Sequence, residues 1–149
     1  AGKIDLNAEI ERLYESKFLS YEEAKSLNLA QIQAFLDSDL LCRALTSKKL
    51  YREYKFISEI PLSITNLEVR DELKNHNIII QGAVDCVFIE NNELVIIDFK
   101  TDKMENEDDF VKVYKEQLDY YSLACEKIFG ISVKERYIYS LHLGKTIKL

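Results

Sequence analysis

Several patterns of hydrophobic and polar residues follow one another along this chain, and each predicts a different kind of element. Up to residue 47, apolar residues recur every three or four positions, which is typical of short amphipathic helices. Residues 48–56 alternate between aromatic and charged side chains, which suits a half-exposed strand that ends before Pro61. Residues 81–100 contain two apolar runs, residues 110–129 return to a helical stripe, and residues 133–142 alternate again. This order predicts an α/β domain with a mixed sheet.

Capping sequences divide the N-terminal part into short helices. We expect a first helix after Asn7, while Ser20-x-x-Glu23 and Asn28-x-x-Gln31 resemble capping boxes that start two more, the second of which breaks near Ser38. We therefore predict that residues 1–47 are a helical scaffold segment of the same domain as residues 48–149. The side chains expected to face a core here include Ile10, Leu13, Tyr14, Phe18, Ile32, Phe35, Leu36, Leu40, Leu41, Ala44 and Leu45.

The stretch from Gln81 to Lys100 reads as a β-hairpin that carries an aspartate well inside each strand. Its centre, Asn91-Asn92, is of the kind that favours tight turns. A two-residue loop places Asp85 opposite Asp98, and a four-residue loop keeps the same register. Cross-strand partners share a sheet face, with Cβ atoms roughly 4.5–5.5 Å apart, so the two carboxylates repel each other unless something compensates.

Candidate compensating groups follow from the same register. Lys100 lies two residues beyond Asp98 and projects from the same face. Burying a carboxylate is costly unless it is paired or bound to a metal, and magnesium takes carboxylate and carbonyl oxygens, keeps several waters and attracts phosphate. The hairpin therefore predicts a site for phosphate chemistry. The alternative is that Asp98 simply pairs with Lys100 while Asp85 is solvated at a strand end.

Three further sets of residues are candidates for function. Gln117 and Tyr121 stand four residues apart in the helix predicted from Phe110 to Phe129, and so share one face. Glu53 is a candidate outer member of the acidic site. In residues 48–56, basic side chains alternate with aromatic ones. These basic residues either contact a nucleic-acid backbone or protect a solvated edge strand from pairing with another chain. They are Lys48, Lys49, Arg52 and Lys55. The helical stripe itself comprises Phe110, Val113, Leu118, Tyr121, Cys125 and Ile128, with Gly130 as its stop.

Composition narrows the functional classes. The chain has 149 residues, a formal net charge of -6 and 47% hydrophobic residues, which argues against a surface that coats nucleic acid in general but not against a nuclease with acidic metal ligands. No run approaches the roughly 20 apolar residues of a membrane span and no signal peptide is visible, so we expect a cytoplasmic protein without a membrane partner. Cys42, Cys86 and Cys125 are widely spaced in apolar runs, which predicts buried, reduced thiols.

Three ordered motifs resemble the RecB-type nuclease domain of the PD-(D/E)XK superfamily. They are Gly82-Ala83-Val84-Asp85, Ile97-Asp98-Phe99-Lys100-Thr101, and Tyr114-x-x-Gln117-Leu118-x-x-Tyr121. The resemblance is closest to the C-terminal nuclease domains of the AddA family, which belong to bacterial ATP-dependent helicase-nucleases that act in double-strand-break repair and recombination. It implies a restriction-endonuclease-like fold, a mixed central β-sheet flanked by helices.

The resemblance also implies roles for individual residues. Asp85 and Asp98 would bind Mg²⁺, with the backbone carbonyl of Phe99 as a further ligand. Lys100 would polarise the attacking water or the scissile phosphate, completing a catalytic set of Asp85, Asp98 and Lys100. Gln117 and Tyr121 would position the DNA strand.

The expected function is that of a magnesium-dependent deoxyribonuclease, exonucleolytic in the full-length protein, whose partners are DNA and a second helicase-nuclease subunit. The chain starts Ala1-Gly2-Lys3 without an initiator Met, which predicts a fragment of a larger protein. ATP would be used only elsewhere in that protein, since no Gly-x-x-x-x-Gly-Lys-[Ser/Thr] occurs here.

One motif of the family is missing from this assignment. A helix bearing a His or Glu normally precedes the hairpin, and it lies either before Ala1, which would leave the fragment inactive alone, or among Glu9, Glu11 and Glu15. The alternative function is a nuclease-like domain that binds DNA ends or partner subunits without cutting.

Overall fold

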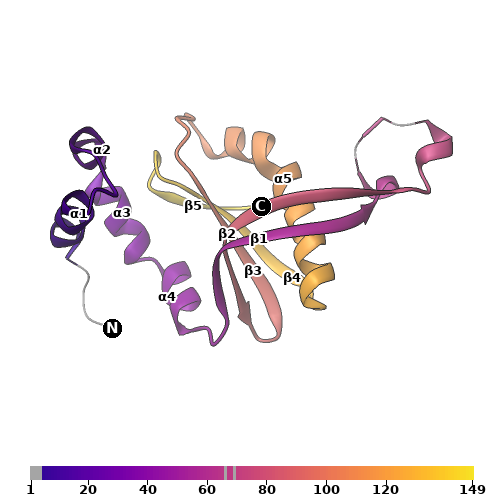
Figure 1. Cartoon of the computed structure of the whole chain (residues 1–149), viewed down its shortest axis with the longest axis horizontal. Coiled ribbons are helices and arrows are strands. Elements are labelled where there is room, and N and C mark those ends of the chain that lie inside the picture. Colours follow the sequence, from indigo (N-terminus) through magenta and orange to yellow (C-terminus); the bar gives the residue numbers. More distant parts are fainter. Residues whose placement is uncertain (1–4, 66, 69) are drawn as a thin grey trace.

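A single five-stranded sheet organises the computed structural model, which describes residues 5–65, 67–68 and 70–149. The strands lie in the order β1-β2-β3-β4-β5, and β3 and β4 run parallel while the other neighbouring pairs are antiparallel (Figure 1). The predicted α/β class with a mixed sheet is therefore confirmed. The strands are β1 (Leu50–Pro61), β2 (Asn77–Glu90), β3 (Glu93–Lys100), β4 (Val133–Ser140) and β5 (Lys145–Lys148).

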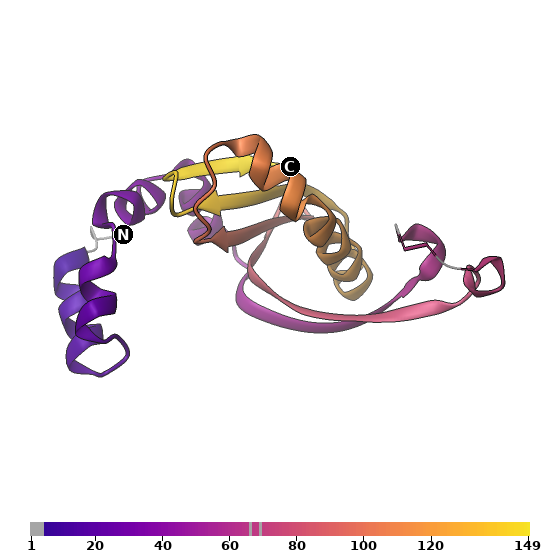
Figure 2. The same cartoon turned by 90° about the horizontal axis from the view of Figure 1, so that it is seen from above.

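Helices cover both faces of the sheet. One face packs against α5 through Val87, Leu94 and Ile96, and the other packs against α4 through Phe88, Val95 and Ile97 (Figure 2). Burial of each such side chain stabilises the fold by about 1.5–3 kcal/mol. Because β3 is buried on both faces, its sequence is a nearly continuous apolar run. The helices are α1 (Leu6–Glu15), α2 (Tyr21–Ser26), α3 (Leu29–Leu36), α4 (Asp39–Thr46) and α5 (Glu107–Phe129), with 3-10 turns η1 (Leu62–Ile64) and η2 (Asp71–Leu73). Within the described residues, no helix is long and apolar enough to cross a membrane.

The first helices differ from the sequence expectation in how much they bury. Helix α1 begins at Leu6, because Asp5 rather than Asn7 accepts the amides of its first turn. Phe18 lies beyond the helix and is 77% exposed, and Tyr14 is 47% exposed, so the prediction that both face a core is wrong. Helices α1, α2 and α3 contain no fully buried residue, and α1 and α2 project away from the sheet (Figure 1). In the described part of the chain, Phe35 of α3 packs against Phe99 and Tyr139 of the sheet, whereas no sheet layer faces the apolar stripes of α1 and α2.

Two of the predicted start signals are confirmed in different degrees. Ser20 and Glu23 form a complete, reciprocal capping box at the start of α2. Asn28 accepts the amide of Gln31, but the Gln31 side chain donates to the carbonyl of His142 instead of closing the box. The predicted break near Ser38 is also confirmed, since Ser38 caps the start of α4.

The turn of the central hairpin and the end of the long helix have the backbone conformations that their residues favour. Asn91 and Asn92 have φ values of 54° and 65°, and Glu90 pairs with Glu93, so the two-residue loop is confirmed. Gly130 ends α5 at φ 69°. Two members of the predicted stripe on α5 are wrong, because Val113 and Ile128 are 57% and 41% exposed and lie off the face that meets the sheet.

The cysteines are free, but they do not all lie in the core. Burial raises the pKa of the Cys86 and Cys125 thiols to about 11, which keeps them protonated and unreactive. Cys42 is exposed on α4, so the expectation that it is buried is wrong.

An ion-pair network anchors α4 to the turn end of the hairpin. Arg43 donates to both carboxylate oxygens of Glu90, at 3.0 and 2.8 Å, and also contacts Glu135 of β4. Lys134 makes a further ion pair with Glu90. These partners, Arg43 first, lower the pKa of Glu90 to about 2.

We predict that Glu90→Gln lowers the free energy of unfolding at pH 7 by about 1 kcal/mol, because charge-assisted hydrogen bonds are lost at a partly solvated site. The folded-state pKa lies below the unfolded value of about 4.3, so this stability is present above that pH and is lost as the pH falls toward 2. Urea denaturation from pH 7 to pH 3 should show the difference between parent and variant shrinking. Glu59→Gln, an exposed position on β1, is the control; a difference that does not depend on pH would contradict the prediction.

Candidate active site

The site forms where β2 separates from β3. The last ladder pair between them is Cys86–Ile97, and the same register continued by one pair places Asp85 opposite Asp98. The ladder stops there, and the β1–β2 ribbon continues beyond the rest of the sheet (Figure 1). The amide of Phe99 is satisfied instead by the Asp85 carboxylate, with an N–Oδ2 distance of 2.7 Å. The half-buried Asp85 side chain thus lies against the backbone next to Asp98.

Strand β1 is irregular at the same level. Glu53 falls between the pairs Arg52–Cys86 and Tyr54–Val84, and it has a φ of 49°, which is uncommon for a residue with a side chain. Glu53 and Asp85 line one cavity of about 420 Å³ beside the sheet. Glu53 therefore lies near the acidic site, and its membership of that site remains a prediction.

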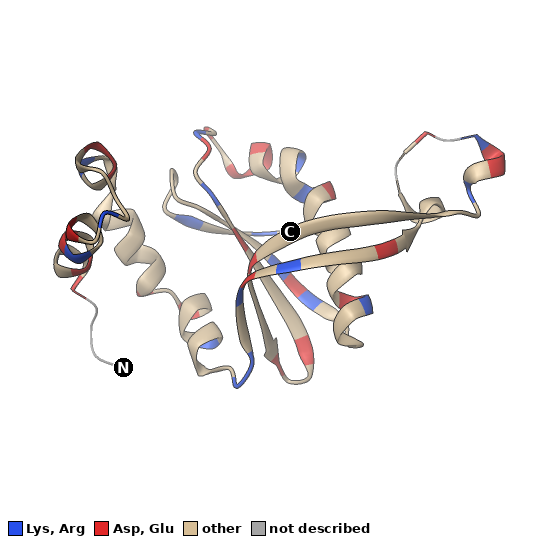
Figure 3. Cartoon of the chain, in the orientation of Figure 1, with Lys and Arg blue, Asp and Glu red and all other residues tan. Residues whose placement is uncertain are grey.

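Asp98 is the buried carboxylate of the site. It is 3% exposed, and its Oδ2 lies 2.5 Å from the Lys100 ammonium, although the angles do not make a hydrogen bond. Burial is the largest influence on its pKa and raises it; the charge of Asp85 raises it further, and Lys100 opposes the shift. Figure 3 shows that β3 carries no other charged residue between Glu93 and this end.

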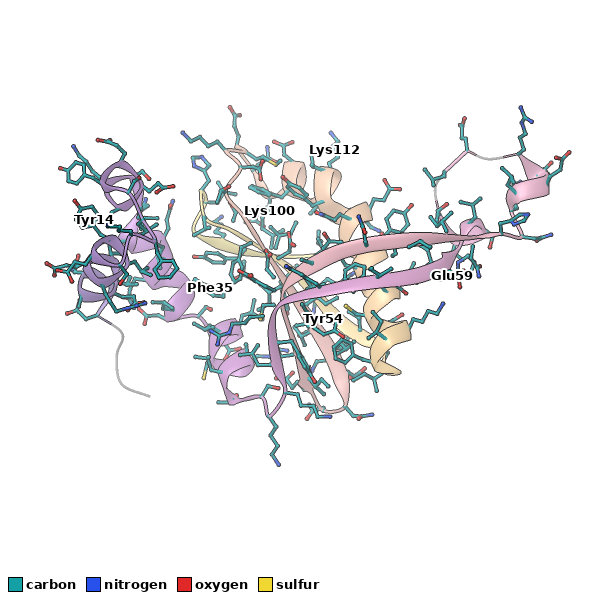
Figure 4. The ribbon with its side chains drawn as sticks, in the orientation of Figure 1. Tyr14, Phe35, Tyr54, Glu59, Lys100 and Lys112 are labelled. Carbon is teal, nitrogen blue, oxygen red and sulfur yellow. The ribbon has the colours of Figure 1, made fainter. Side chains whose placement is uncertain are left out.

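Helix α5 supplies the other partners of Lys100, which Figure 4 labels at this end of β3. The ammonium donates to Gln117 Oε1 at 3.2 Å and lies 4.3 Å from the centre of the Tyr114 ring. Gln117 in turn donates to the hydroxyl of Tyr121 at 3.1 Å. A continuous line of polar contacts therefore runs from Asp98 to Tyr121.

Gly82 in the first motif has a steric role that sequence reasoning missed. A Cβ atom at this position would lie 2.9 Å from the Tyr121 ring and 3.0 Å from the Phe56 ring. Those two rings pack edge to face, with centroids 5.3 Å apart. The absence of a side chain at Gly82 is therefore what allows Tyr121 to lie against the ribbon.

The structure brings together Asp85, Asp98, Lys100, Gln117 and Tyr121, the residues that the motifs single out. Of the other candidates, Arg52 and Glu53 line the cavity that Asp85 also lines. Lys48 and Lys49 line a separate pocket near the Asn91-Asn92 turn, at the opposite end of the hairpin. The acidic residues of α1 lie in the projecting helical region, where Figure 4 labels Tyr14 far from Lys100. Sequence reasoning also missed the contacts of Tyr114, although its spacing of three from Gln117 places both on one helix face.

The donor atoms at this site fit a hard divalent cation. Asp98 Oδ2 is buried and lacks a hydrogen-bond partner in the described part of the chain, and a second carboxylate lies beside it. Magnesium is typically held by one or two carboxylates and completes its shell with waters and substrate phosphate. Among the described residues, no three His, Cys, Asp or Glu side chains gather to hold a metal on their own.

We predict that Asp98→Asn raises the melting temperature in EDTA at pH 7, because it removes a buried charge. The folded-state pKa of Asp98 is raised, so the protonated carboxyl contributes stability below its unfolded pKa, and this is lost as the pH rises through the folded value. The advantage of asparagine should therefore shrink toward pH 4 in calorimetric scans. Asp71→Asn, at an exposed position, is the matched control; a lower melting temperature for Asp98→Asn at pH 7 would contradict the prediction.

Comparison with known proteins agrees with this geometry. The family model of the PD-(D/E)XK nuclease superfamily matches residues 3–145. The chain is 37% identical over 147 residues to an ATP-dependent helicase/nuclease subunit of Clostridium botulinum strain Alaska E43, and the match covers 96% of this chain and 12% of that protein. The corresponding subunit is 38% identical over 152 residues in Clostridium perfringens and over 151 in Clostridium beijerinckii, each match covering 97% of this chain and 12% of the relative.

The chain thus spans 12% of the length of these relatives. Its mixed sheet flanked by helices is the restriction-endonuclease-like arrangement that the motifs imply. With a family match from residue 3 to residue 145, the chain belongs to the PD-(D/E)XK nuclease superfamily.

Proposed function

We propose that this chain is the nuclease domain of a helicase-nuclease and hydrolyses phosphodiester bonds in DNA with Mg²⁺, as an exonuclease. The observation that carries the proposal is the buried Asp98 carboxylate beside Asp85 and Lys100. Burying a charge is costly unless an opposite charge, a hydrogen bond or a metal ion compensates, and such groups cluster at functional sites. The relatives are named as ATP-dependent helicase/nuclease subunits, which supports the same assignment.

The residues of the site divide the work among them. Asp85, Asp98 and the carbonyl of Phe99 would hold Mg²⁺. When bound, the ion would supply a Lewis acid for the phosphate and lower the pKa of a coordinated water. Lys100 places a compact positive charge where negative charge develops on the phosphate, or polarises the attacking water. Gln117 and Tyr121 would position the DNA strand.

The rest of the assignment concerns a longer protein. We propose that residues 48–149 are the nuclease core and residues 1–47 a helical scaffold segment of the same domain, within a larger protein. In that protein, ATP would be used outside this chain, and a second helicase-nuclease subunit would be its partner. The larger protein would act in double-strand-break repair and recombination.

Cleavage assays on linear single-stranded and double-stranded DNA test the proposal directly, in the longest natural form of the protein and in this chain. Asp98→Ala and Lys100→Ala should each lower the rate about 100-fold or more, because each removes a charge that stabilises the transition state. Closed circular DNA should resist cleavage if the activity is exonucleolytic. Asp71→Ala is the control, and an Asp98→Ala variant that cuts as fast as the parent would refute the assignment.

Metal binding has a readout that does not depend on cleavage. Mg²⁺ should raise the melting temperature of the parent, since a ligand that binds only the folded state stabilises it by RT ln(1 + [L]/Kd). The increase should be lost in Asp85→Asn and in Asp98→Asn and reversed by EDTA. Equal increases in parent and variants would place the ion elsewhere.

A second candidate function is a nuclease-like domain that binds DNA ends or partner subunits without cutting. It is favoured by the small ligand set, because no third acidic or histidine side chain joins Asp85 and Asp98 among the described residues. This function predicts DNA-end binding that persists in EDTA and no cleavage at any chain length. Cleavage by the parent that Asp98→Ala abolishes would exclude it.

A further inference from the structure

The Lys100 ammonium lies over an aromatic ring that the proposed reaction does not yet use. Its Nζ is 4.3 Å from the centre of the Tyr114 ring, within the range of a cation–π interaction. The Tyr114 hydroxyl donates to Asp102 Oδ2 at 2.7 Å. Tyr114 therefore has Lys100 at its ring and Asp102 at its hydroxyl.

These contacts join three consecutive elements of the chain. Lys100 ends β3, Asp102 lies two residues later in the following loop, and Tyr114 lies on α5. Tyr114 and Gln117 are three residues apart on one face of α5, so the same face presents both to the ammonium. Burial and the hydrogen bond to Asp102 raise the pKa of Tyr114 to about 12, which keeps the phenol protonated and able to donate.

The contacts of Lys100 would not all persist when a metal ion is bound. Its shortest contact is to Asp98 Oδ2, and this is the carboxylate that would hold the metal ion. If Asp98 held the ion, its Oδ2 would be less available to the ammonium, and Lys100 would keep Gln117 and Tyr114 as partners. An aromatic ring attracts the charge without accepting a directed hydrogen bond from each N–H, so donors stay available for phosphate.

We propose that Tyr114, anchored by Asp102, is the positioning residue that holds the Lys100 ammonium at the site. The effect on catalysis rests on the proposed function, whereas the position of Lys100 over the Tyr114 ring does not depend on it. Tyr114 also packs against Phe110, with ring centroids 6.2 Å apart. A purely structural role for Tyr114 would change stability alone and leave Lys100 where it is.

NMR of the lysine ε-methylene groups in metal-free protein tests the geometry without any cleavage. A methylene over a ring is shifted upfield, and Lys100→Arg identifies the Lys100 signal by its loss. Tyr114→Phe keeps the ring but loses the hydrogen bond to Asp102 and should keep only part of the upfield shift, whereas Tyr114→Leu should move the signal to the position of a solvated lysine. An unchanged Lys100 signal in a folded Tyr114→Leu variant overturns the proposal.

A matched control comes from a second lysine over a tyrosine. Lys148 lies 5.8 Å from the centre of the Tyr137 ring, and its side chain is 59% exposed. Tyr137→Leu should move the Lys148 signal, leave the Lys100 signal in place and leave the cleavage rate unchanged. A shift of Lys100 in this variant would mean that the spectra report general repacking, which counts against Tyr114.

A double-mutant cycle tests the catalytic consequence. Tyr114→Leu should lower kcat about tenfold, with little change in KM for DNA, and Tyr114→Phe, which keeps the ring without its anchor to Asp102, should restore part of the loss. In a Lys100→Ala background, Tyr114→Leu should have no further effect on kcat, because the group that it positions is absent. Equal effects in both backgrounds overturn the positioning role. If the longest natural form of the protein does not cleave DNA, the proposed function fails, and the NMR result still decides whether Tyr114 holds Lys100.

Discussion

The hydrogen bond from the Phe99 amide to the Asp85 carboxylate marks the point on which the site depends. In an antiparallel ladder, every second amide of a strand donates to the neighbouring strand. When one strand leaves the ladder, these amides of its neighbour lose their acceptors. Here the side chain of the departing strand takes over the bond that its backbone gives up. The same substitution brings a carboxylate to the backbone beside Asp98. Departure of the ribbon and assembly of the acidic pair are therefore one structural event.

Helix α5 constrains the other half of the site. Its apolar residues Leu118, Ala124 and Cys125 are fully buried, and this fixes the rotation of the helix about its axis. Gln117 lies beside Leu118 at the margin of the buried face, where a polar side chain reaches the end of β3 without leaving the protein interior entirely. The packing of the core thus determines the direction in which Lys100 is held. A domain whose sheet is covered on both faces has few other places for such a contact.

Local rules account for much of what the sequence predicts correctly. Asn91 and Asn92 accept left-handed φ values, and that property alone sets the hairpin register. Alternation with period two then predicts that Asp98 and Lys100 share a face, and the spacing of four predicts the same for Gln117 and Tyr121. These residues need only one or two elements to be right, so short-range reasoning suffices.

Features that depend on three or more elements could not be predicted in this way. Phe18 has an apolar side chain at helical spacing, but no layer covers it in the described structure. Glu53 adopts a left-handed φ on β1 at the level where β2 leaves β3, and no glycine or asparagine marks that position. Tyr114 and Asp102 meet because the loop that joins β3 to α5 brings Asp102 within 2.7 Å of the Tyr114 hydroxyl. The patterns of single elements contain no information about such meetings.

Gly82 shows that the placement of Tyr121 has a thermodynamic cost. A glycine within a strand lowers stability by roughly 0.5–1 kcal/mol relative to alanine, because more backbone entropy is lost on folding. Alanine is excluded here by the two rings that occupy the space of its methyl group. Strand stability therefore favours a side chain at position 82, whereas the placement of Tyr121 against the ribbon requires that none be there, so the two make opposing demands on one backbone position.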